Sequence, residues 1–157
     1  MTTARVRTRA LDTASIEAVL AKHHVATLGI AFHDQVSLLL VNYVYADRWV
    51  YARLETGPDL ESIKHHPWVA LAVNEIDGIY DWRTVTVNGS LELLKDEPAT
   101  VQSREFHEAL ERLRAVVPEV LTTRDPMPQR VQLVRVHADE LAGREARSSG
   151  RIRESSP

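Results

Sequence analysis

Arg53, Thr56 and Gly57 are the residues whose types and spacing most directly suggest chemistry. Arg53 stands at the end of a short apolar segment, and a Thr-Gly-Pro turn and a short helical segment follow it. A cation, a turn that contains glycine and the N-terminus of a helix all favour the binding of an anion. The spacing therefore predicts an anion site at this turn, with the alternative that Arg53 is a solvated charge at a strand end.

Other chemistries have little support in the sequence. The pairs His23-His24 and His65-His66 invite a metal site, but side chains at adjacent helical positions diverge by about 100°, so neither pair is expected to chelate one ion. The chain has no cysteine, which excludes thiolate chemistry and fits a reducing compartment. It also has no Gly-x-Ser-x-Gly elbow, Gly-x-Gly-x-x-Gly fingerprint or phosphate-binding loop. We therefore predict neither a metal site nor a hydrolase triad.

The composition carries no strong charge bias. The 157 residues include 19 basic and 22 acidic side chains, so neither a nucleic acid nor an anionic membrane is an expected partner. The N-terminal region has arginines but no apolar core, so it does not look like a secretory signal. No apolar run approaches the ~20 residues of a membrane span. We expect a soluble cytoplasmic protein with one domain.

Hydrophobic periodicity predicts three helices and six strands. A helix is expected from Asp12 or Thr13 to about His23, because apolar residues recur there at spacings of three and four. The other predicted helices cover 59–66 and 98–117, and the predicted strands cover 25–32, 36–45, 49–52, 68–75, 82–94 and 130–137. Residues 1–11 are expected to form a mobile arm. Residues 1–145 are expected to form one domain, and residues 146–157 a polar C-terminal tail.

The helices are inserted between strands and do not alternate with them as in βαβ units. Hairpins therefore dominate, and the predicted fold class is mainly β, a six-stranded antiparallel split β-barrel with inserted helices. The strand 36–45 is apolar on both faces, so it is expected to be covered on both sides. Asn42 lies within this strand, and a buried amide there needs a hydrogen-bond partner.

The strand 82–94 has two different faces. The apolar set that begins at Val85 is expected to face the core, whereas the set that contains Trp82 and Thr84 suits water, a partner or a ligand. Gly89 interrupts the strand and would let it bend, as closure of a barrel requires.

The order of these segments resembles the pyridoxamine 5'-phosphate oxidase-like FMN-binding split barrels. It is most similar to the branch that includes nitroimidazole-reductase-like flavin-binding proteins. The resemblance covers roughly residues 13–145, and its order and spacing are more specific than any single piece. The most specific pieces are Val41-Asn42-Tyr43, the Trp82-x-Thr84-Val85-x-Val87-x-Gly89 strand and Leu141-Ala142-Gly143-Arg144-Glu145.

The resemblance implies a homodimer that binds FMN at the subunit interface. It also implies an oxidoreductase that acts on an unspecified small molecule, with the flavin carrying the hydride chemistry. The flavin ring would lie along the strand that contains Asn42, and the phosphate would lie at the start of the short helix. The cofactor-binding residues that the resemblance implies are Val41, Asn42, Tyr43, Arg53, Leu54, Thr56, Gly57, Trp82 and Thr84.

The sequence departs from the family at the phosphate turn. The family often has a basic turn such as Gly-Lys-Lys, whereas this chain has Gly57-Pro58-Asp59. Pro58 has no backbone N–H, and two like unit charges at ~4 Å repel by about 1 kcal/mol even in water. Arg53 replaces the usual histidine and could donate two hydrogen bonds to a phosphate. The departure motivates two alternatives: the same fold with a deazaflavin or haem-type ligand, and a dimeric module without a cofactor.

Several of these residues also have a structural interpretation. Asn42 can be a satisfied core amide, Tyr43 an ordinary strand residue and Trp82 part of core or interface packing. Asp59 fits the first turn of a helix, where the dipole favours an acid.

Overall fold

A computed structural model describes residues 4–150 of the chain. This part of the chain forms eight strands and three helices, and none of the helices in it is long and apolar enough to cross a membrane. In chain order the elements are β1 (Arg5–Ala10), α1 (Thr13–Lys22), β2 (Val25–Phe32), β3 (Gln35–Ala46), β4 (Trp49–Leu54), α2 (Pro58–His65), β5 (Trp68–Gly78), β6 (Asp81–Leu93), α3 (Val101–Arg114), β7 (Gln132–His137) and β8 (Glu140–Ser149).

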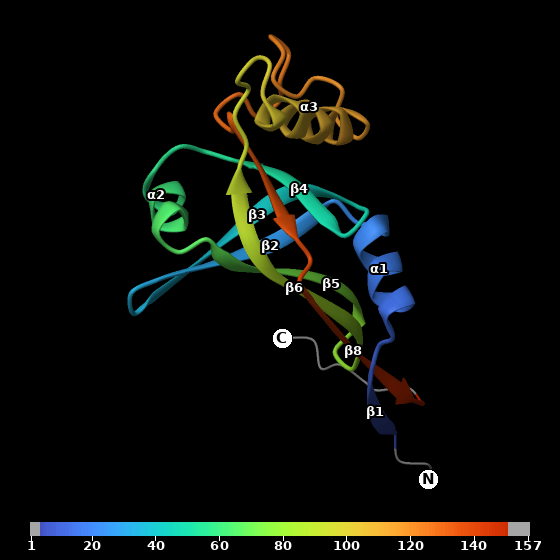
Figure 1. The fold of residues 1–157 in the computed structure, drawn as a ribbon. Coiled ribbons are helices and arrows are strands. Elements are labelled where there is room, and N and C mark those ends of the chain that lie inside the picture. The colour runs from blue at the N-terminus through green and yellow to red at the C-terminus, as the bar shows by residue number, and fades with distance from the viewer. Residues whose placement is uncertain (1–3, 151–157) are drawn as a thin grey trace.

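Six of the strands close into a barrel. Neighbouring strands follow the order β6-β5-β2-β3-β4-β7, and a pairing between β6 and β7 closes the ring. All of these pairings are antiparallel. The predicted fold class, a mainly β antiparallel barrel of six strands with inserted helices, is therefore confirmed. In Figure 1, α1 and α2 lie on opposite sides of the barrel, and α3 lies across its upper end.

The long strand β6 changes partner along its length. Its first part pairs with β8, from Trp82 to Asn88, and its last part pairs with β7, from Leu91 to Leu93. Gly89 lies between the two parts, where a Cβ atom would stand 1.9 Å from the carbonyl oxygen of His137. Because only a residue without a Cβ allows so close an approach, Gly89 makes the change of partner possible at the position where the sequence predicts a bend.

Alternate residues of the strands fill the barrel. Val85 and Val87 of β6 are fully buried, as their period of two predicts. Helix α1 packs beside the barrel, and its N-terminus is capped by Asp12, which accepts a hydrogen bond of 2.8 Å from the backbone N–H of Ser15. A second apolar cluster lies between α3 and the outer side of β4 and β7, and its buried members include Tyr51, Ala109, Leu110, Leu113 and Leu133.

Two strands lie where the sequence predicts no element. The expected mobile arm contains β1, and β8 runs from Glu140 into the expected tail as far as Ser149. β1 pairs with β8, which in turn pairs with β6. All six residues of β1 are exposed, so no apolar face marks this strand in the sequence, and charged side chains are typical of an edge strand. Residues 151–157 of the expected tail lie outside the described residues.

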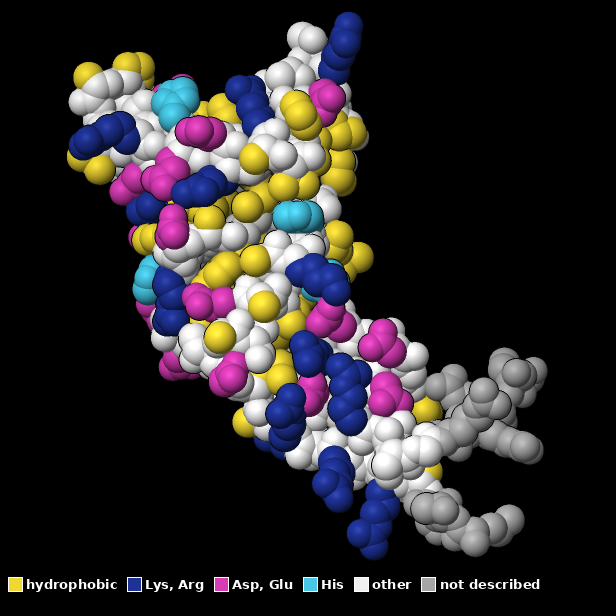
Figure 2. Space-filling model, turned by 90° about the vertical axis from the view of Figure 1, so that its right-hand side faces the viewer, with side chains coloured by type: hydrophobic (Ala, Val, Ile, Leu, Met, Phe, Trp, Pro, Cys, Tyr) yellow, Lys and Arg dark blue, Asp and Glu magenta, His cyan; other side chains and the backbone are white. Residues whose placement is uncertain are grey.

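Ion pairs attach this two-stranded extension to the barrel. Glu145 of β8 is 3 % exposed and accepts hydrogen bonds from Arg9 of β1 and from Arg83 of β6, the latter at 2.9 Å. The hydrogen bond from Arg9, followed by that from Arg83, holds the pKa of Glu145 below its usual value. Figure 2 shows basic side chains gathered over this end of the molecule, interspersed with acidic ones. These charges therefore have a structural role in joining β1, β8 and β6.

Candidate functional site

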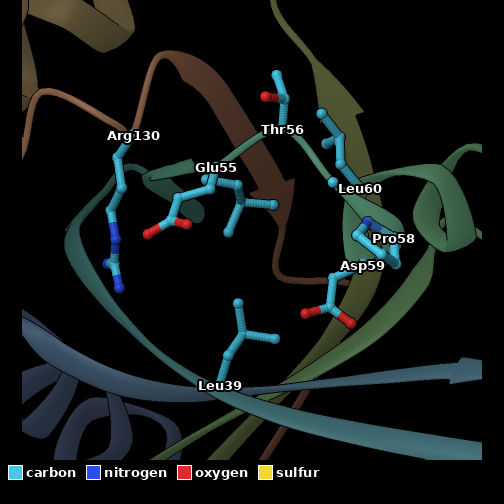
Figure 3. A pocket seen from close by; sticks show the side chains of 9 residues that line it. Leu39, Glu55, Thr56, Pro58, Asp59, Leu60 and Arg130 are labelled. Carbon is cyan, nitrogen blue, oxygen red and sulfur yellow. The ribbon is translucent and has the colours of Figure 1, made fainter.

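A cavity of about 260 Å³ lies at the N-terminus of α2. We call it the α2 cavity. The turn between β4 and α2 forms one side of it, and Leu39 points into it from β3 (Figure 3). Its lining is Leu39, Leu54, Glu55, Thr56, Gly57, Pro58, Asp59, Leu60 and Arg130. The structure therefore brings together Leu54, Thr56 and Gly57, three of the residues that the resemblance implies for cofactor binding.

The charges of the α2 cavity do not balance. The carboxylates of Glu55 and Asp59 point into the cavity, and Arg130 lies on the same side as Glu55, across the cavity from Asp59 (Figure 3). The guanidinium of Arg130 donates a hydrogen bond of 2.9 Å from Nη2 to the carbonyl oxygen of Leu40. Two carboxylates and one guanidinium leave the lining with one negative charge in excess.

The hydrogen-bond donors of the turn are mostly backbone N–H groups. The first N–H groups of a helix have no acceptor within it, but Pro58 has no N–H. The N–H of Glu61 donates to the carbonyl oxygen of Gly57 at 3.1 Å. Besides the N–H of Glu61, the donors of this turn are the backbone N–H groups of Thr56, Gly57, Asp59 and Leu60 and the hydroxyl of Thr56.

Arg53 lies outside the α2 cavity, which corrects the prediction that it faces the phosphate turn. Its guanidinium is almost fully buried and forms a bidentate ion pair with Asp125, in which Nη2 donates to Oδ1 at 2.8 Å. Asp125 also accepts from the backbone N–H groups of Leu121 and Met127. The hydrogen bond from Arg53 lowers the pKa of Asp125 well below its usual value, so this carboxylate is ionised at neutral pH. A buried guanidinium needs such a partner.

The ion pair nevertheless helps to position Arg130, a residue that lines the α2 cavity. Arg53 Nη1 donates a hydrogen bond of 3.4 Å to the carbonyl oxygen of Arg130, and Asp125 organises the loop that leads to Arg130. Arg53 is therefore a positioning residue, because it fixes the backbone that presents the only guanidinium among the lining residues of the cavity.

One face of the sheet formed by β3, β2 and β5 is exposed and apolar. The strand β3 is therefore not covered on both sides within a single chain, contrary to the sequence prediction, and Val36 and Leu38 are both 72 % exposed. Large patches of this kind mark surfaces that bind a partner or a ligand. We call this surface the open sheet face, and its large apolar members are Val25, Val36, Leu38, Leu40, Trp68 and Ile76.

Two shallow hollows lie along the open sheet face. Trp82 and Thr84 line the first, of about 380 Å³, and Leu40 lines the second, of about 300 Å³. Asn74 of β5 lines both, so the hollows are neighbours. Thr84 Oγ1 donates a hydrogen bond of 2.7 Å to Asn74 Oδ1. The structure thus places Trp82 and Thr84 at a polar spot on an otherwise apolar surface.

The three implied residues of β3 point to different sides. Val41 and Tyr43 are each 1 % exposed and face the core, where the Tyr43 hydroxyl donates to the carbonyl oxygen of Leu20 at 2.7 Å. Burial raises the pKa of Tyr43. Asn42 is exposed and pairs with Val25 at the edge of the open sheet face. Only Asn42 therefore offers its side chain to a ligand, and Val41 and Tyr43 offer backbone groups at most.

A single chain does not unite Asn42 with Thr84. The strands β3 and β6 are separated by β2 and β5, and three spacings of about 4.8 Å put the two strands ~14 Å apart. Six of the implied residues therefore fall into three groups, in the α2 cavity, at the hollow of Thr84 and at Asn42, whereas Val41, Tyr43 and Arg53 are buried.

Arg130, Glu55 and Leu39 are site residues that the sequence analysis missed. β7 pairs with β4 so that Leu54 stands opposite Gln132, which brings the residues just before β7 to the end of β4. This pairing is the signal that could have identified Arg130, and it requires knowing which strand is the neighbour of β4. Glu55 lies between Leu54 and Thr56, which the sequence did single out, and Leu39 lies two residues before Val41.

The histidine pairs have other contacts. His23 Nε2 lies 2.9 Å from Glu75 Oε2, and the rings of His65 and His66 lie against Phe32. Between residues 4 and 150, no group of three or more His, Cys, Asp or Glu side chains is arranged to hold a metal ion.

Comparisons with known proteins bear on the fold and the family. Among solved structures, an FAD-binding protein from Mesorhizobium loti has a TM-score of 0.70 and 23% identity, with 91% of this chain and 99% of that chain covered. An FAD-binding protein from Mycobacterium smegmatis has a TM-score of 0.63 and 17% identity over 87% and 98% of the two chains. An FAD and heme binding protein from the same organism has a TM-score of 0.62 and 14% identity over 92% and 75%.

At these identities the likeness to solved structures shows the fold alone. The comparison with proteins of curated function found no match. A family model described as pyridoxamine 5'-phosphate oxidase matches residues 12–145, which span all six strands of the barrel and the three helices. The chain therefore belongs to the pyridoxamine 5'-phosphate oxidase family.

Proposed function

We propose that this protein is a dimeric flavin-dependent oxidoreductase that acts on a small molecule. Two copies meet through the open sheet face, and a flavin lies at the interface between them. The observation that carries the proposal is the open sheet face itself, where six large apolar side chains are between 49 % and 74 % exposed. Asn42, Asn74 and Thr84 lie on the same face, where Asn42 pairs with Val25 and Asn74 is two residues from Ile76. The surface therefore offers both apolar contact and hydrogen bonds.

The geometry of a two-fold dimer supports this arrangement. Consider a two-fold axis that is parallel to the strands and lies over the open sheet face, above the line between β2 and β5. Rotation about this axis places β3 of one chain opposite β6 of the other. Asn42 then approaches Trp82 and Thr84 of the partner subunit. Within one chain, by contrast, about three strand spacings separate Asn42 from Thr84. Such a two-fold interface is self-complementary, as in most homodimers.

The ring of a flavin fits this surface. The flavin ring system is aromatic and has one polar edge, and the open sheet face is apolar and carries a hydroxyl and amide groups, so the two are chemically complementary. When bound, the flavin supplies the hydride chemistry. The chain would bind the ring, exclude water with Leu38 and Leu40, and orient the polar edge through Asn42 and Thr84.

FMN and FAD share this ring, so the proposal covers both. The resemblance to FMN-binding barrels favours FMN, and FAD is what the similar structures from Mesorhizobium loti and Mycobacterium smegmatis are named for. The terminal phosphate of FMN, however, does not fit the α2 cavity, because the lining of that cavity has one negative charge in excess. A deazaflavin shares the ring geometry and is the second candidate.

The test is a flavin titration of wild-type protein and of two matched variants. We expect Leu38→Asp to weaken both the dimer and flavin binding at least tenfold, because it places a charge within an apolar interface. Val101→Asp makes the same change at an exposed valine of α3, which lies outside the open sheet face, and should change neither. Light scattering gives the oligomeric state, and quenching of flavin fluorescence gives the affinity.

Two results would overturn the proposal. One is a wild-type protein that binds no flavin or deazaflavin at micromolar concentrations. The other is a Leu38→Asp variant that is monomeric and still binds flavin with the wild-type affinity, since the second chain would then be irrelevant to the site.

A further inference from the structure

We propose that the α2 cavity binds uncharged hydroxyl groups of a flavin side chain and rejects a terminal phosphate dianion. This chain would then prefer riboflavin or FAD to FMN. The preference rests on the proposed function, because it concerns which flavin the site takes.

The α2 cavity adjoins the open sheet face across β3. The side chain of Leu40 lines a hollow of that face, while its carbonyl oxygen accepts a hydrogen bond from Arg130, which lines the cavity. Leu39, the preceding residue, points into the cavity (Figure 3). A ligand whose ring lies on the open sheet face can therefore extend a flexible side chain past β3 into the cavity.

The charge of the cavity opposes a phosphate monoester. Such a group carries about −1.5 to −2 charges at pH 7, and Glu55 and Asp59 outnumber Arg130 in the lining. Arg53 does not offset this excess of negative charge, because its guanidinium is bound to Asp125. The diphosphate of FAD carries one charge on each phosphate, so the phosphate next to the ribityl chain is less charged than the monoester of FMN, and riboflavin has no phosphate. Both should therefore meet less repulsion in the cavity than FMN.

The hydrogen-bonding groups of the cavity favour hydroxyls. Ionised carboxylates only accept hydrogen bonds, so the exposed carboxylates of Glu55 and Asp59 can accept hydrogen bonds from the hydroxyl donors of a ligand. A ribityl chain supplies hydroxyl donors, and a carboxylate that binds sugar hydroxyls is an established arrangement in nucleotide sites. Phosphate oxygens are acceptors and would face these carboxylates without a shared proton.

The first test compares three flavins on the wild-type protein. Affinities for riboflavin, FMN and FAD are measured by isothermal titration at pH 7.5 and low salt, where screening of charges is weakest. We expect riboflavin and FAD to bind about tenfold more tightly than FMN, which corresponds to about 1.4 kcal/mol. Lowering the pH toward about 5.5 protonates the FMN phosphate and should narrow the gap.

The second test uses variants that remove one negative charge each. Asp59→Asn and Glu55→Gln should each tighten FMN binding about threefold and change riboflavin binding less than twofold. Glu61→Gln is the matched control, because Glu61 lies in the first turn of the same helix but pairs with Lys64 at 2.9 Å and does not line the cavity. It should leave both affinities unchanged.

The possible outcomes distinguish a failure of this preference from a failure of the proposed function. Binding of any flavin together with an affinity for FMN that equals or exceeds that for riboflavin overturns the preference and leaves the proposed function standing. Folded Asp59→Asn and Glu55→Gln variants that behave like Glu61→Gln overturn it as well. A wild-type protein that binds neither these three flavins nor a deazaflavin overturns the proposed function and the preference together, and binding of a deazaflavin alone overturns the preference only.

Discussion

Arg53 shows how the surroundings of a side chain decide its role. The sequence context predicts that Arg53 binds a phosphate. In the structure, however, its side chain is 7 % exposed and is paired with Asp125, which is 2 % exposed. An ion pair at this depth is costly to break, because the remaining charge is left without a partner. Arg53 therefore supports the site through Arg130, and its charge is not available to a ligand.

The buried ion pair gives a prediction about stability. Asp125→Ala should lower the free energy of unfolding by about 3–5 kcal/mol, because it leaves a buried guanidinium unpaired. The measurement is urea denaturation at neutral pH. Asp139→Ala is the control, since Asp139 is 45 % exposed in its pair with His137 and should change stability by less than about 1 kcal/mol. Equal effects of the two variants would contradict the role of Asp125.

The same pair makes stability depend on pH. The hydrogen bond from Arg53 places the pKa of Asp125 below the usual value of 3.8. A carboxyl whose pKa is lowered by folding stabilises the folded state above its unfolded pKa, and this contribution is lost as the pH falls. The difference in unfolding free energy between wild type and Asp125→Ala should therefore stay constant from about pH 5 to 8 and shrink below about pH 4. A difference that grows in acid would be inconsistent with it.

At the residue scale, sequence predicts local neighbours better than distant ones. Leu54, Thr56 and Gly57 meet in the α2 cavity because they follow one another at the end of a strand. The partner of Arg53 is 72 residues away, in a loop without periodicity, so no local pattern identifies it. Arg130 was missed for the same reason.

At the scale of elements, apolar patterning identifies the strands that form the core. β2 covers the predicted residues 25–32, and the six barrel strands and three helices all lie where they are expected. β1 and β8 were missed because an edge strand needs no apolar face, and β1 is held by backbone pairing and by Arg9 and Glu145. Patterning also could not show that one face of β3 is left open, because an apolar strand face looks the same whether its own chain or a second chain covers it.

The bend in β6 gives a prediction at this scale. Gly89→Ala should lower the free energy of unfolding by about 1–3 kcal/mol, because the added Cβ would overlap the carbonyl oxygen of His137 and separate β6 from β7. Gly29→Ala is the control in β2, where a Cβ would meet its nearest neighbour at 3.5 Å. Thermal and urea unfolding of the two variants make the comparison. A Gly89→Ala variant as stable as Gly29→Ala would show that β6 can bend without glycine.

At the scale of the molecule, the single chain leaves a large apolar surface exposed. The barrel buries its own core, yet it leaves a broad apolar face open, and six of the implied flavin residues lie on separate strands of that face or in the cavity beside it. Family membership places the chain among pyridoxamine 5'-phosphate oxidase proteins. The dimer that we propose, with a flavin at its interface, would cover the open sheet face and bring the residues on it together.

Native mass spectrometry of the protein after incubation with flavins tests this central claim most directly. The dimer account predicts a species of two chains, each of 17.7 kDa, that carries two flavins and releases them when Leu38→Asp splits the dimer. A species of one chain without flavin, at protein and flavin concentrations well above micromolar, would contradict it.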